Sequence, residues 1–143
     1  DDAEVLEALE RVLVDTLDGY SLHDIERYGL HEAAKRQLTD LSWFPSPRTW
    51  WRLAYDHDGD LVGFIMPARN PMRPVIGYIG VVPEHRGRGY VDDLLAEQTR
   101  ILAEVMGEDE EIGADTDVDN TPMAAAFARA GYRSVGVRVV MVA

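Results

Sequence analysis

The chain has 143 residues, 46% of them hydrophobic, which suffices for one domain with a buried core and excludes wholesale disorder. Its formal net charge of −12 argues against non-specific binding to nucleic acids, because such binding requires a basic surface. The sequence has no cysteine, no apolar run of the roughly 20 residues needed to span a membrane, and no recognisable signal peptide. We therefore expect a cytoplasmic protein without disulfides.

The first third of the chain is predicted to be helical. Apolar residues recur at helical spacing over residues 2–18. Ser21 is predicted to cap a second helix, Gly29 to end it, and residues 31–40 to form a third helical segment. Two prolines then predict a loop over residues 42–47.

The middle of the chain changes to the alternation typical of strands. Residues 49–56 and 61–66 are predicted to form a hairpin around the turn Asp58-Gly59. Residues 75–82 follow as a third strand, and their continuous apolar character predicts a central position in the sheet.

The last third alternates helices with strands. Residues 90–106 are predicted to form a long helix and residues 112–117 a short strand. The next helix is capped by Asn120 or Thr121, and a valine-rich strand over residues 135–142 ends the chain. The hairpin is antiparallel, whereas the strand-helix-strand crossovers predict parallel pairing, so the sequence predicts a mixed α/β sheet.

A loop rich in arginine and glycine joins the third strand to the helix that begins at Tyr90. A helix N-terminus carries free N–H groups and a partial positive charge, so it can hold a phosphate, and Gly87 and Gly89 let the backbone approach that anion closely. Asp92 stands where a Rossmann fingerprint needs its third glycine, and no Gly-Lys-Ser/Thr sequence is present. On these residues alone, a phosphate site and a glycine turn that only joins strand to helix both stay open.

Two segments resemble a known family. Residues 80–90 resemble the acetyl-CoA motif of the GNAT superfamily of N-acetyltransferases, which is Arg/Gln-x-x-Gly-x-Gly/Ala after a Val-x-Pro strand end. Asn120 and residues 123–132 look like the family segment Asn-x-x-Ala-x-x-x-Tyr-x-x-x-Gly-Phe. The resemblance implies a GNAT-type fold, a mostly antiparallel mixed sheet flanked by helices, here short of the family's first and last strands.

The resemblance also implies which residues bind acetyl-CoA. Backbone groups of one strand would pair with the pantetheine arm, and loop amides would surround the pyrophosphate while two arginines add charge. Asn120 would contact the cofactor or hold the second crossover. The implied residues are Ile79, Gly80 and Val81 on the strand, Arg86, Gly87, Arg88, Gly89, Tyr90 and Val91 at the loop, and Asn120.

Three positions depart from the family pattern. Val91 occupies the place of the second Gly/Ala, where a branched side chain crowds the phosphate site although its amide is still available. Phe127 stands where many members carry the tyrosine that protonates the leaving thiolate, and Val75 where some keep a glutamate base. Neither side chain can transfer a proton.

Other residues are therefore candidates for the chemistry. Acyl transfer to an amine needs a base or a water chain that takes a proton. Asp115 resembles the position of a carboxylate base in the GNAT branch that acetylates ribosomal-protein N-termini, and Asp117 lies on the same face of the predicted strand. The alternative for both is a solvated strand end. Tyr78 is a candidate for the missing acid, against the alternative of a half-buried aromatic, and the scattered histidines predict no metal site.

We expect residues 1–143 to form one acetyl-CoA-dependent N-acetyltransferase domain that acetylates an amine of a small molecule or peptide by direct transfer. The alternative is a non-catalytic acyl-CoA-binding or regulatory domain of a larger or tandem protein. Because the chain does not begin with methionine and lacks both outer strands, we also expect a longer polypeptide, a homodimer or a tandem partner to complete the sheet.

Overall fold

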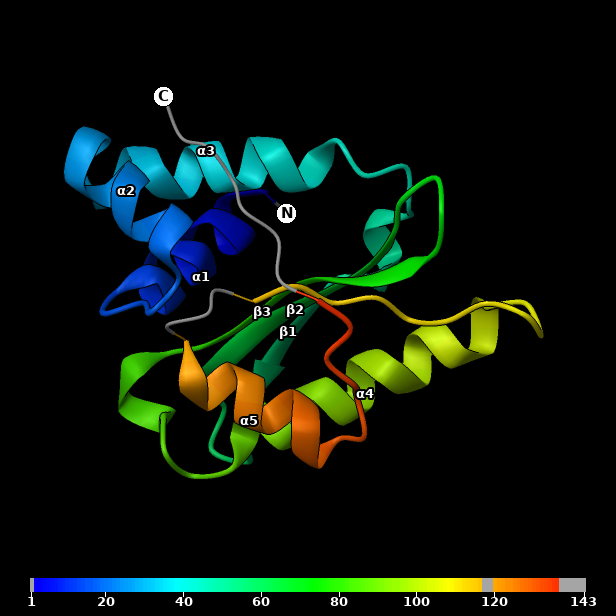
Figure 1. Ribbon diagram of the computed structural model, residues 1–143. Helices are drawn as coiled ribbons and strands as arrows, with labels where there is room; N and C mark the ends of the chain where they lie inside the picture. Colours follow the sequence, from blue (N-terminus) through cyan, green and yellow to red (C-terminus); the bar gives the residue numbers. More distant parts are fainter. Residues whose placement is uncertain (1, 117–119, 137–143) are drawn as a thin grey trace.

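The computed structural model describes residues 2–116 and 120–136 of the chain. Helices cover both faces of a small sheet (Figure 1). On one face lie α1 (Asp2–Leu13), α2 (Gly19–Tyr28) and α3 (Leu30–Ser42), and on the other α4 (Tyr90–Val105) and α5 (Thr121–Arg129). The sheet contains β1 (Arg52–Tyr55), β2 (Leu61–Arg69) and β3 (Pro74–Val81), and two 3₁₀ turns, η1 (Arg48–Trp50) and η2 (Pro83–His85), flank it. The predicted mixed α/β class is confirmed.

Helix α1 packs its apolar stripe onto the sheet, as its spacing predicts. Leu9 is completely buried, and Val5 and Val12 are nearly so. The helix ends at Leu13, earlier than the predicted residue 18, because Asp15 adopts a left-handed φ of 55° and turns the chain. The segment from Asp15 to α2 is therefore a loop.

Helix α2 is capped by Asp18, so the prediction that Ser21 caps it is wrong. The Asp18 carboxylate accepts hydrogen bonds from the amide of Ser21 at 3.0 Å and from its hydroxyl at 2.7 Å. A carboxylate at this position also suits the positive end of the helix. The predicted break at Gly29 is confirmed, with a φ of 87° that favours glycine.

The hairpin β1–β2 forms where the sequence predicts it. The Asp56 carboxylate accepts from the amides of Asp58 at 2.9 Å and Asp60 at 3.0 Å, which closes the turn. β1 begins later than predicted because residues 48–50 form η1, in which the Trp50 amide donates to the Pro47 carbonyl at 3.1 Å. In the described part of the chain the sheet order is β1-β2-β3, antiparallel throughout.

The outer edge of β3 is paired at one point only among the described residues. A parallel bridge joins Val75 to Gly113, and the Ile76 amide donates to the Gly113 carbonyl at 2.9 Å. The predicted strand 112–117 thus shortens to one bridge in the residues described. Beyond that bridge the edge of β3 is open to the cleft described below.

A bulge interrupts the register between β2 and β3 next to that bridge. Met66 pairs with Tyr78 and Pro67 with Ile76, so Gly77 is left as the extra residue. A Cβ at Gly77 would lie 2.6 Å from the Met66 methyl carbon and 2.7 Å from the Met66 carbonyl oxygen. Only glycine fits this close approach of two strands.

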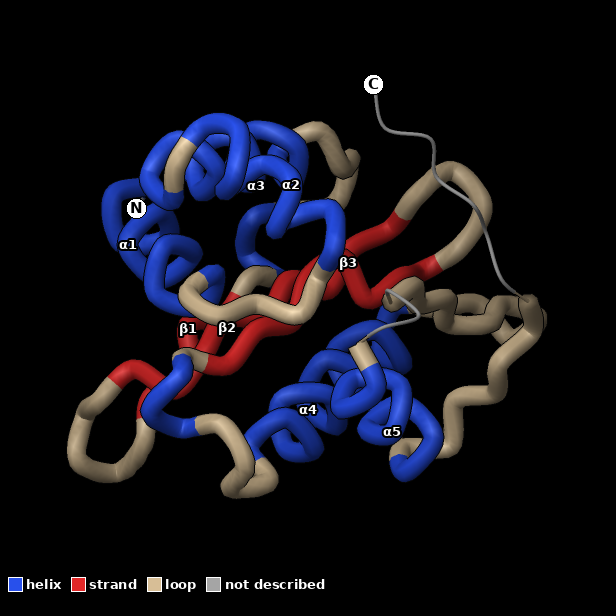
Figure 2. The backbone as a smooth tube through the Cα atoms, turned by 60° about the vertical axis from the view of Figure 1, so that its left-hand side comes forward, coloured by secondary structure: helices blue, strands red, loops and turns tan. Residues whose placement is uncertain are grey.

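Each face of the sheet has its own packing. Phe64 and Met66 of β2 are fully buried and belong to the core cluster that includes α1 and α3. On the other face α4 buries Leu95 and Leu102, and α5 runs alongside α4 (Figure 2). No helix in the described ranges is long and apolar enough to cross a membrane. The predicted strand 135–142 lies, apart from its first two residues, outside the described residues.

Candidate functional site

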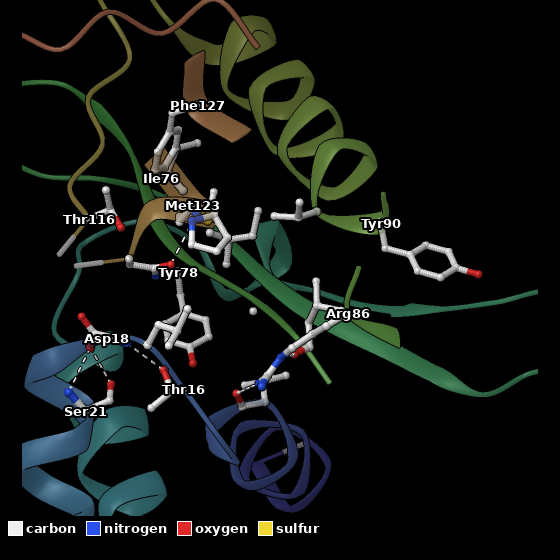
Figure 3. A pocket seen from close by; sticks show the side chains of 18 of the residues that line it. Thr16, Asp18, Ser21, Ile76, Tyr78, Arg86, Tyr90, Thr116, Met123 and Phe127 are labelled. Carbon is white, nitrogen blue, oxygen red and sulfur yellow. Dashed lines mark hydrogen bonds between the residues drawn. The ribbon is translucent and has the colours of Figure 1, made fainter. Parts of the chain in front are cut away.

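A cleft of about 760 Å³ opens along the outer edge of β3 (Figure 3). Regions that are far apart in the sequence line it: the α1–α2 loop, β3 with the loop before α4, residues 115–116, and α5 with Asn120 before it. Val12, Ser21 and Gln37 of the first three helices complete the lining. Its volume falls within the range of about 300–1,000 Å³ typical of small-molecule sites. The open strand edge and the N-terminus of α4 meet in this cleft.

The loop before α4 presents free backbone amides. Gly87 and Gly89 have φ values of 76° and 84°, which turn the chain sharply into α4. None of the amides of residues 87–91 donates a hydrogen bond to another described residue. Together with the helix dipole, these amides form a site suited to an anion such as a pyrophosphate. Arg88 is exposed, and Val91 lies half-buried in the first turn with its amide among the free ones.

Arg86 holds three parts of the chain together. Its Nε donates to the Val81 carbonyl at 2.9 Å, Nη1 to the Asp15 carbonyl at 3.1 Å and Nη2 to the Val12 carbonyl at 2.8 Å. These bonds satisfy carbonyls at the end of α1, where a cation is favoured. Arg86 lines the cleft, but its donors serve carbonyls, so its predicted contact with the pyrophosphate stays a prediction.

The outer edge of β3 offers backbone groups to a ligand. The Val82 amide donates to the Val62 carbonyl on β2 at 2.8 Å. Backbone groups alternate in direction along a strand, so Gly80 also faces β2 while Ile79 and Val81 face outward. The Val81 carbonyl already accepts from Arg86, which leaves Ile79 as the freest position for strand-like pairing.

Tyr78 lies between the sheet and the α1–α2 loop. Its ring packs against Phe64 with centroids 5.7 Å apart, and it points toward Thr16 and Asp18 (Figure 3). Burial raises the pKa of Tyr78 above its ordinary value of 10.0, and the Asp18 carboxylate adds to the effect while Arg86 opposes it. The phenol is therefore protonated at neutral pH and can act there as a proton donor but not as a base.

Phe127 lines the cleft from α5 without a polar atom. Its ring packs against Tyr132 at 5.3 Å, and the Tyr132 hydroxyl lies 2.6 Å from the Thr99 hydroxyl of α4. The hydroxyl of this second aromatic thus fixes the end of α5 to α4. Neither residue supplies the cleft with an acid.

The two predicted carboxylates fall on the segment after Gly113. Asp115 is exposed and lines the cleft together with Thr116. Asp117 lies outside the described residues. Asn120 caps α5, because its side chain accepts from the Met123 amide at 3.3 Å, so of the two predicted caps Asn120 is correct. It also lines the cleft, and its predicted contact with a cofactor stays a prediction.

The sequence did not predict that the α1–α2 loop lines the cleft, nor which residues His85 contacts. The α1–α2 loop contributes Asp15, Thr16 and Asp18, which the helical pattern of residues 2–18 placed inside a helix. His85 is 8% exposed, stacks edge-on against Tyr90 at 5.5 Å and has its Nε2 3.9 Å from the Asp56 carboxylate. The apolar spacing of residues 2–18 predicts a continuous helix, so the sequence did not indicate this loop. Nothing in the sequence pairs His85 with Asp56.

Arg129 also lines the cleft, at the end of α5. Its Nε and Nη2 donate to the Asp92 carboxylate in the first turn of α4, the Nη2 distance being 3.0 Å. Arg129 falls within residues 123–132, which resemble the family segment, but the resemblance assigns it no role. Within the described ranges, no group of three or more His, Cys, Asp or Glu side chains is placed to hold a metal ion.

Comparisons with known proteins point to one family. The sequence model that describes the acetyltransferase (GNAT) family matches residues 16–132 of this chain. Mycothiol acetyltransferase of Clavibacter sepedonicus is 37% identical over 87 residues, which are 61% of this chain and 28% of that protein. The chain thus aligns with under a third of that relative.

Solved structures share the fold. An aminoglycoside 6′-N-acetyltransferase of Acinetobacter haemolyticus superimposes with a TM-score of 0.64 at 15% identity, covering 100% of this chain and 94% of that one. An aminoglycoside acetyltransferase from an uncultured soil sample gives a TM-score of 0.59 at 19% identity, with coverages of 100% and 92%. At these identities the likeness concerns the fold alone.

Proposed function

This chain belongs to the acetyltransferase (GNAT) family, and from that premise we propose that it transfers an acetyl group from acetyl-CoA to an amine. The observation that carries the proposal is the meeting of two features in one cleft: the free amides of residues 87–91 and the open edge of β3. The first suits a pyrophosphate and the second an extended amide-bearing arm. Acetyl-CoA contains both groups.

In this proposal, different residues of the cleft bind different parts of acetyl-CoA. Amides of residues 87–91 hold the pyrophosphate, and the outward groups of Ile79 and Val81 pair with the pantetheine arm. Acetyl-CoA supplies the activated thioester. The Ile79 amide is the donor best placed to polarise the thioester carbonyl, because it faces outward on the open edge of β3.

Transfer requires two proton movements. The amine nitrogen bonds to the acetyl carbon as the carbon–sulfur bond breaks, the amine loses a proton and the CoA sulfur gains one. We assign proton removal to Asp115, acting directly or through water, because it is a carboxylate lining the cleft. We assign proton donation to Tyr78, because its phenol lines the cleft and is protonated at neutral pH, whereas Phe127 cannot donate a proton.

The acceptor is a small cationic amine in this proposal. Asp15, Asp18 and Asp115 line the cleft, and Arg86 donates to three carbonyls there. Carboxylates attract an ammonium and orient it before it loses its proton. The relative that is 37% identical is named for mycothiol, which supports a small-molecule acceptor over a peptide.

The test is release of free thiol from acetyl-CoA across a panel of amines. We expect turnover with at least one cationic small-molecule amine, and competitive inhibition against acetyl-CoA by desulfo-CoA. Acetyl-CoA binding without thiol release from any amine would refute the catalytic proposal.

A second candidate function is a non-catalytic acyl-CoA-binding domain. The apolar Phe127 at the family's tyrosine position favours it. Binding of acetyl-CoA without turnover, unchanged in Asp115→Asn and Tyr78→Phe variants, would support this second candidate.

A further inference from the structure

The first turn of α4 combines an anion site with a carboxylate. Asp92 directly follows the free amides of residues 87–91, and its own amide bonds to Gly89 at 3.1 Å. An aspartate in a first turn stabilises the helix dipole, but it also repels a phosphate bound at the same helix end. A cation that faces both groups would remove this conflict.

Arg129 is the cation that contacts Asp92. Its Nε lies 3.2 and 3.3 Å from the two Asp92 carboxylate oxygens, and its Nη2 lies 3.0 Å from one of them. This bidentate contact through Nε and Nη2 orients the guanidinium. The remaining nitrogen, Nη1, has no hydrogen bond to any described residue. Figures 1 and 2 show α5 beside α4, which brings the end of one helix to the start of the other.

The ion pair has little to contribute to stability. Both side chains are about half exposed, 53% for Arg129 and 46% for Asp92, and exposed pairs add little to the free energy of unfolding. Arg129 nevertheless lines the cleft, as the free amides do. Arg86, the arginine assigned to the pyrophosphate by the sequence motif, already donates to three carbonyls.

We propose that Arg129 is a phosphate-binding residue for CoA, with Asp92 as the group that orients its guanidinium. The inference rests on the proposed binding of acetyl-CoA in this cleft. Arg129 supplies a charge-assisted hydrogen bond from Nη1 to a phosphate oxygen of the cofactor, either in the diphosphate or in the 3′-phosphate.

The test is calorimetric titration of CoA into four proteins. Arg129→Gln should weaken binding about tenfold, because one charge-assisted hydrogen bond is lost. Asp92→Asn removes a repulsive charge and also the group that orients Arg129, so these opposing effects should keep its Kd for CoA within about threefold of wild type. The doubly substituted protein should bind more weakly than Asp92→Asn alone.

The double variant separates direct contact from neutralisation. If Arg129 only cancels the charge of Asp92, its replacement has no effect once Asp92 is neutral, and that result would overturn the proposal. Arg100→Gln is the matched control, since Arg100 pairs with Glu97 and Glu104 on the same helix but does not line the cleft. It should leave the Kd of CoA unchanged.

Two further arms complete the design. With 3′-dephospho-CoA, a vanished difference between wild type and Arg129→Gln assigns the contact to the 3′-phosphate, and a persisting difference assigns it to the diphosphate. If wild type does not bind CoA at all, the proposed function fails. If wild type binds and Arg129→Gln binds equally well, only this inference fails.

Discussion

Asp115 is the residue on which the chemistry of the proposal depends. It is a carboxylate at the rim of the cleft, directly after the segment that bridges to β3. Its place there was predictable, because the family segment that begins at Asn120 fixes the spacing. Asp117, the second predicted candidate for the base, lies outside the described residues. Kinetics of variants at the two positions would distinguish the candidates.

Replacing Asp115 by Asn should lower kcat at least about tenfold and leave the Kd of acetyl-CoA nearly unchanged, because a base is lost and no cofactor contact is. Steady-state kinetics together with calorimetry would measure both quantities. Asp109→Asn, in the turn that follows α4, is the matched control and should have no effect. Unaltered turnover in Asp115→Asn would remove this residue from the mechanism.

Tyr78 raises the complementary question of the proton donor. Tyr78→Phe keeps the ring that packs on Phe64 and deletes only the hydroxyl. We expect kcat to fall at least about tenfold while the KM for acetyl-CoA stays within a factor of about two. An unchanged kcat would mean that the leaving sulfur takes its proton from solvent.

The same substitution predicts an effect of pH on stability. Because the folded-state pKa of Tyr78 is raised, the unfolded chain loses the phenol proton first as pH rises through about 10, which favours unfolding. Denaturant titrations should show that wild type loses more stability than Tyr78→Phe between neutral pH and about pH 11. Parallel losses in the two proteins would contradict the raised pKa.

At the scale of elements, β3 organises the site. It pairs with β2 along its inner edge, meets Gly113 at one bridge and is open beyond the bulge at Gly77. The strand itself was predictable from its apolar run. The bulge was not, because it depends on the approach of Met66 from the neighbouring strand, a contact that periodicity within one segment does not encode.

Gly77→Ala should lower the free energy of unfolding by about 1–3 kcal/mol, because the added Cβ meets both the side chain and the carbonyl of Met66 at under 3 Å. Thermal or denaturant unfolding measures this directly. At Gly107 the nearest atom to an added Cβ is a Glu110 oxygen at 3.6 Å, so Gly107→Ala is a control that should be near neutral. Equal stability of the two variants would show that the strands can separate at the bulge without cost.

Ion pairs join distant segments at the scale of the whole molecule. Glu110, after α4, bonds to Arg69 at the end of β2, and its carboxylate also accepts from the Gly107 amide at 2.8 Å. The Arg69 guanidinium, followed by the Gly107 amide, lowers the pKa of Glu110 from its ordinary 4.5 to about 2. A depressed pKa adds stability above pH 4.5 that is lost as pH falls toward 2.

Glu110→Gln should therefore be less stable than wild type at pH 7, and the difference should shrink as pH falls from about 4.5 to 2. Urea unfolding at a series of pH values would follow it. The neighbouring exposed Glu111→Gln serves as the control. A constant difference at every pH would show that the Glu110 carboxylate is not tied to Arg69 by its charge.

The sequence predicted the class of the fold, the hairpin and the glycine turn into α4, because each rests on local periodicity, turn residues or a contiguous motif. It did not predict the end of α1, the role of Arg86 or the pairing of Arg129 with Asp92. The last two of these features join residues that are distant in the chain: Arg86 reaches back to Val12, and Arg129 of α5 reaches Asp92 at the start of α4. Local patterns carry no information on such contacts.

The central claim is that the cleft beside β3 binds acetyl-CoA through the amides of residues 87–91. Titrating CoA into ¹⁵N-labelled protein while following these amide resonances tests it most directly. We predict saturable downfield shifts of the Gly87 and Gly89 amides at micromolar CoA, since hydrogen bonding to phosphate deshields the amide proton. Resonances of residues 87–91 that stay unmoved at millimolar CoA would contradict the claim.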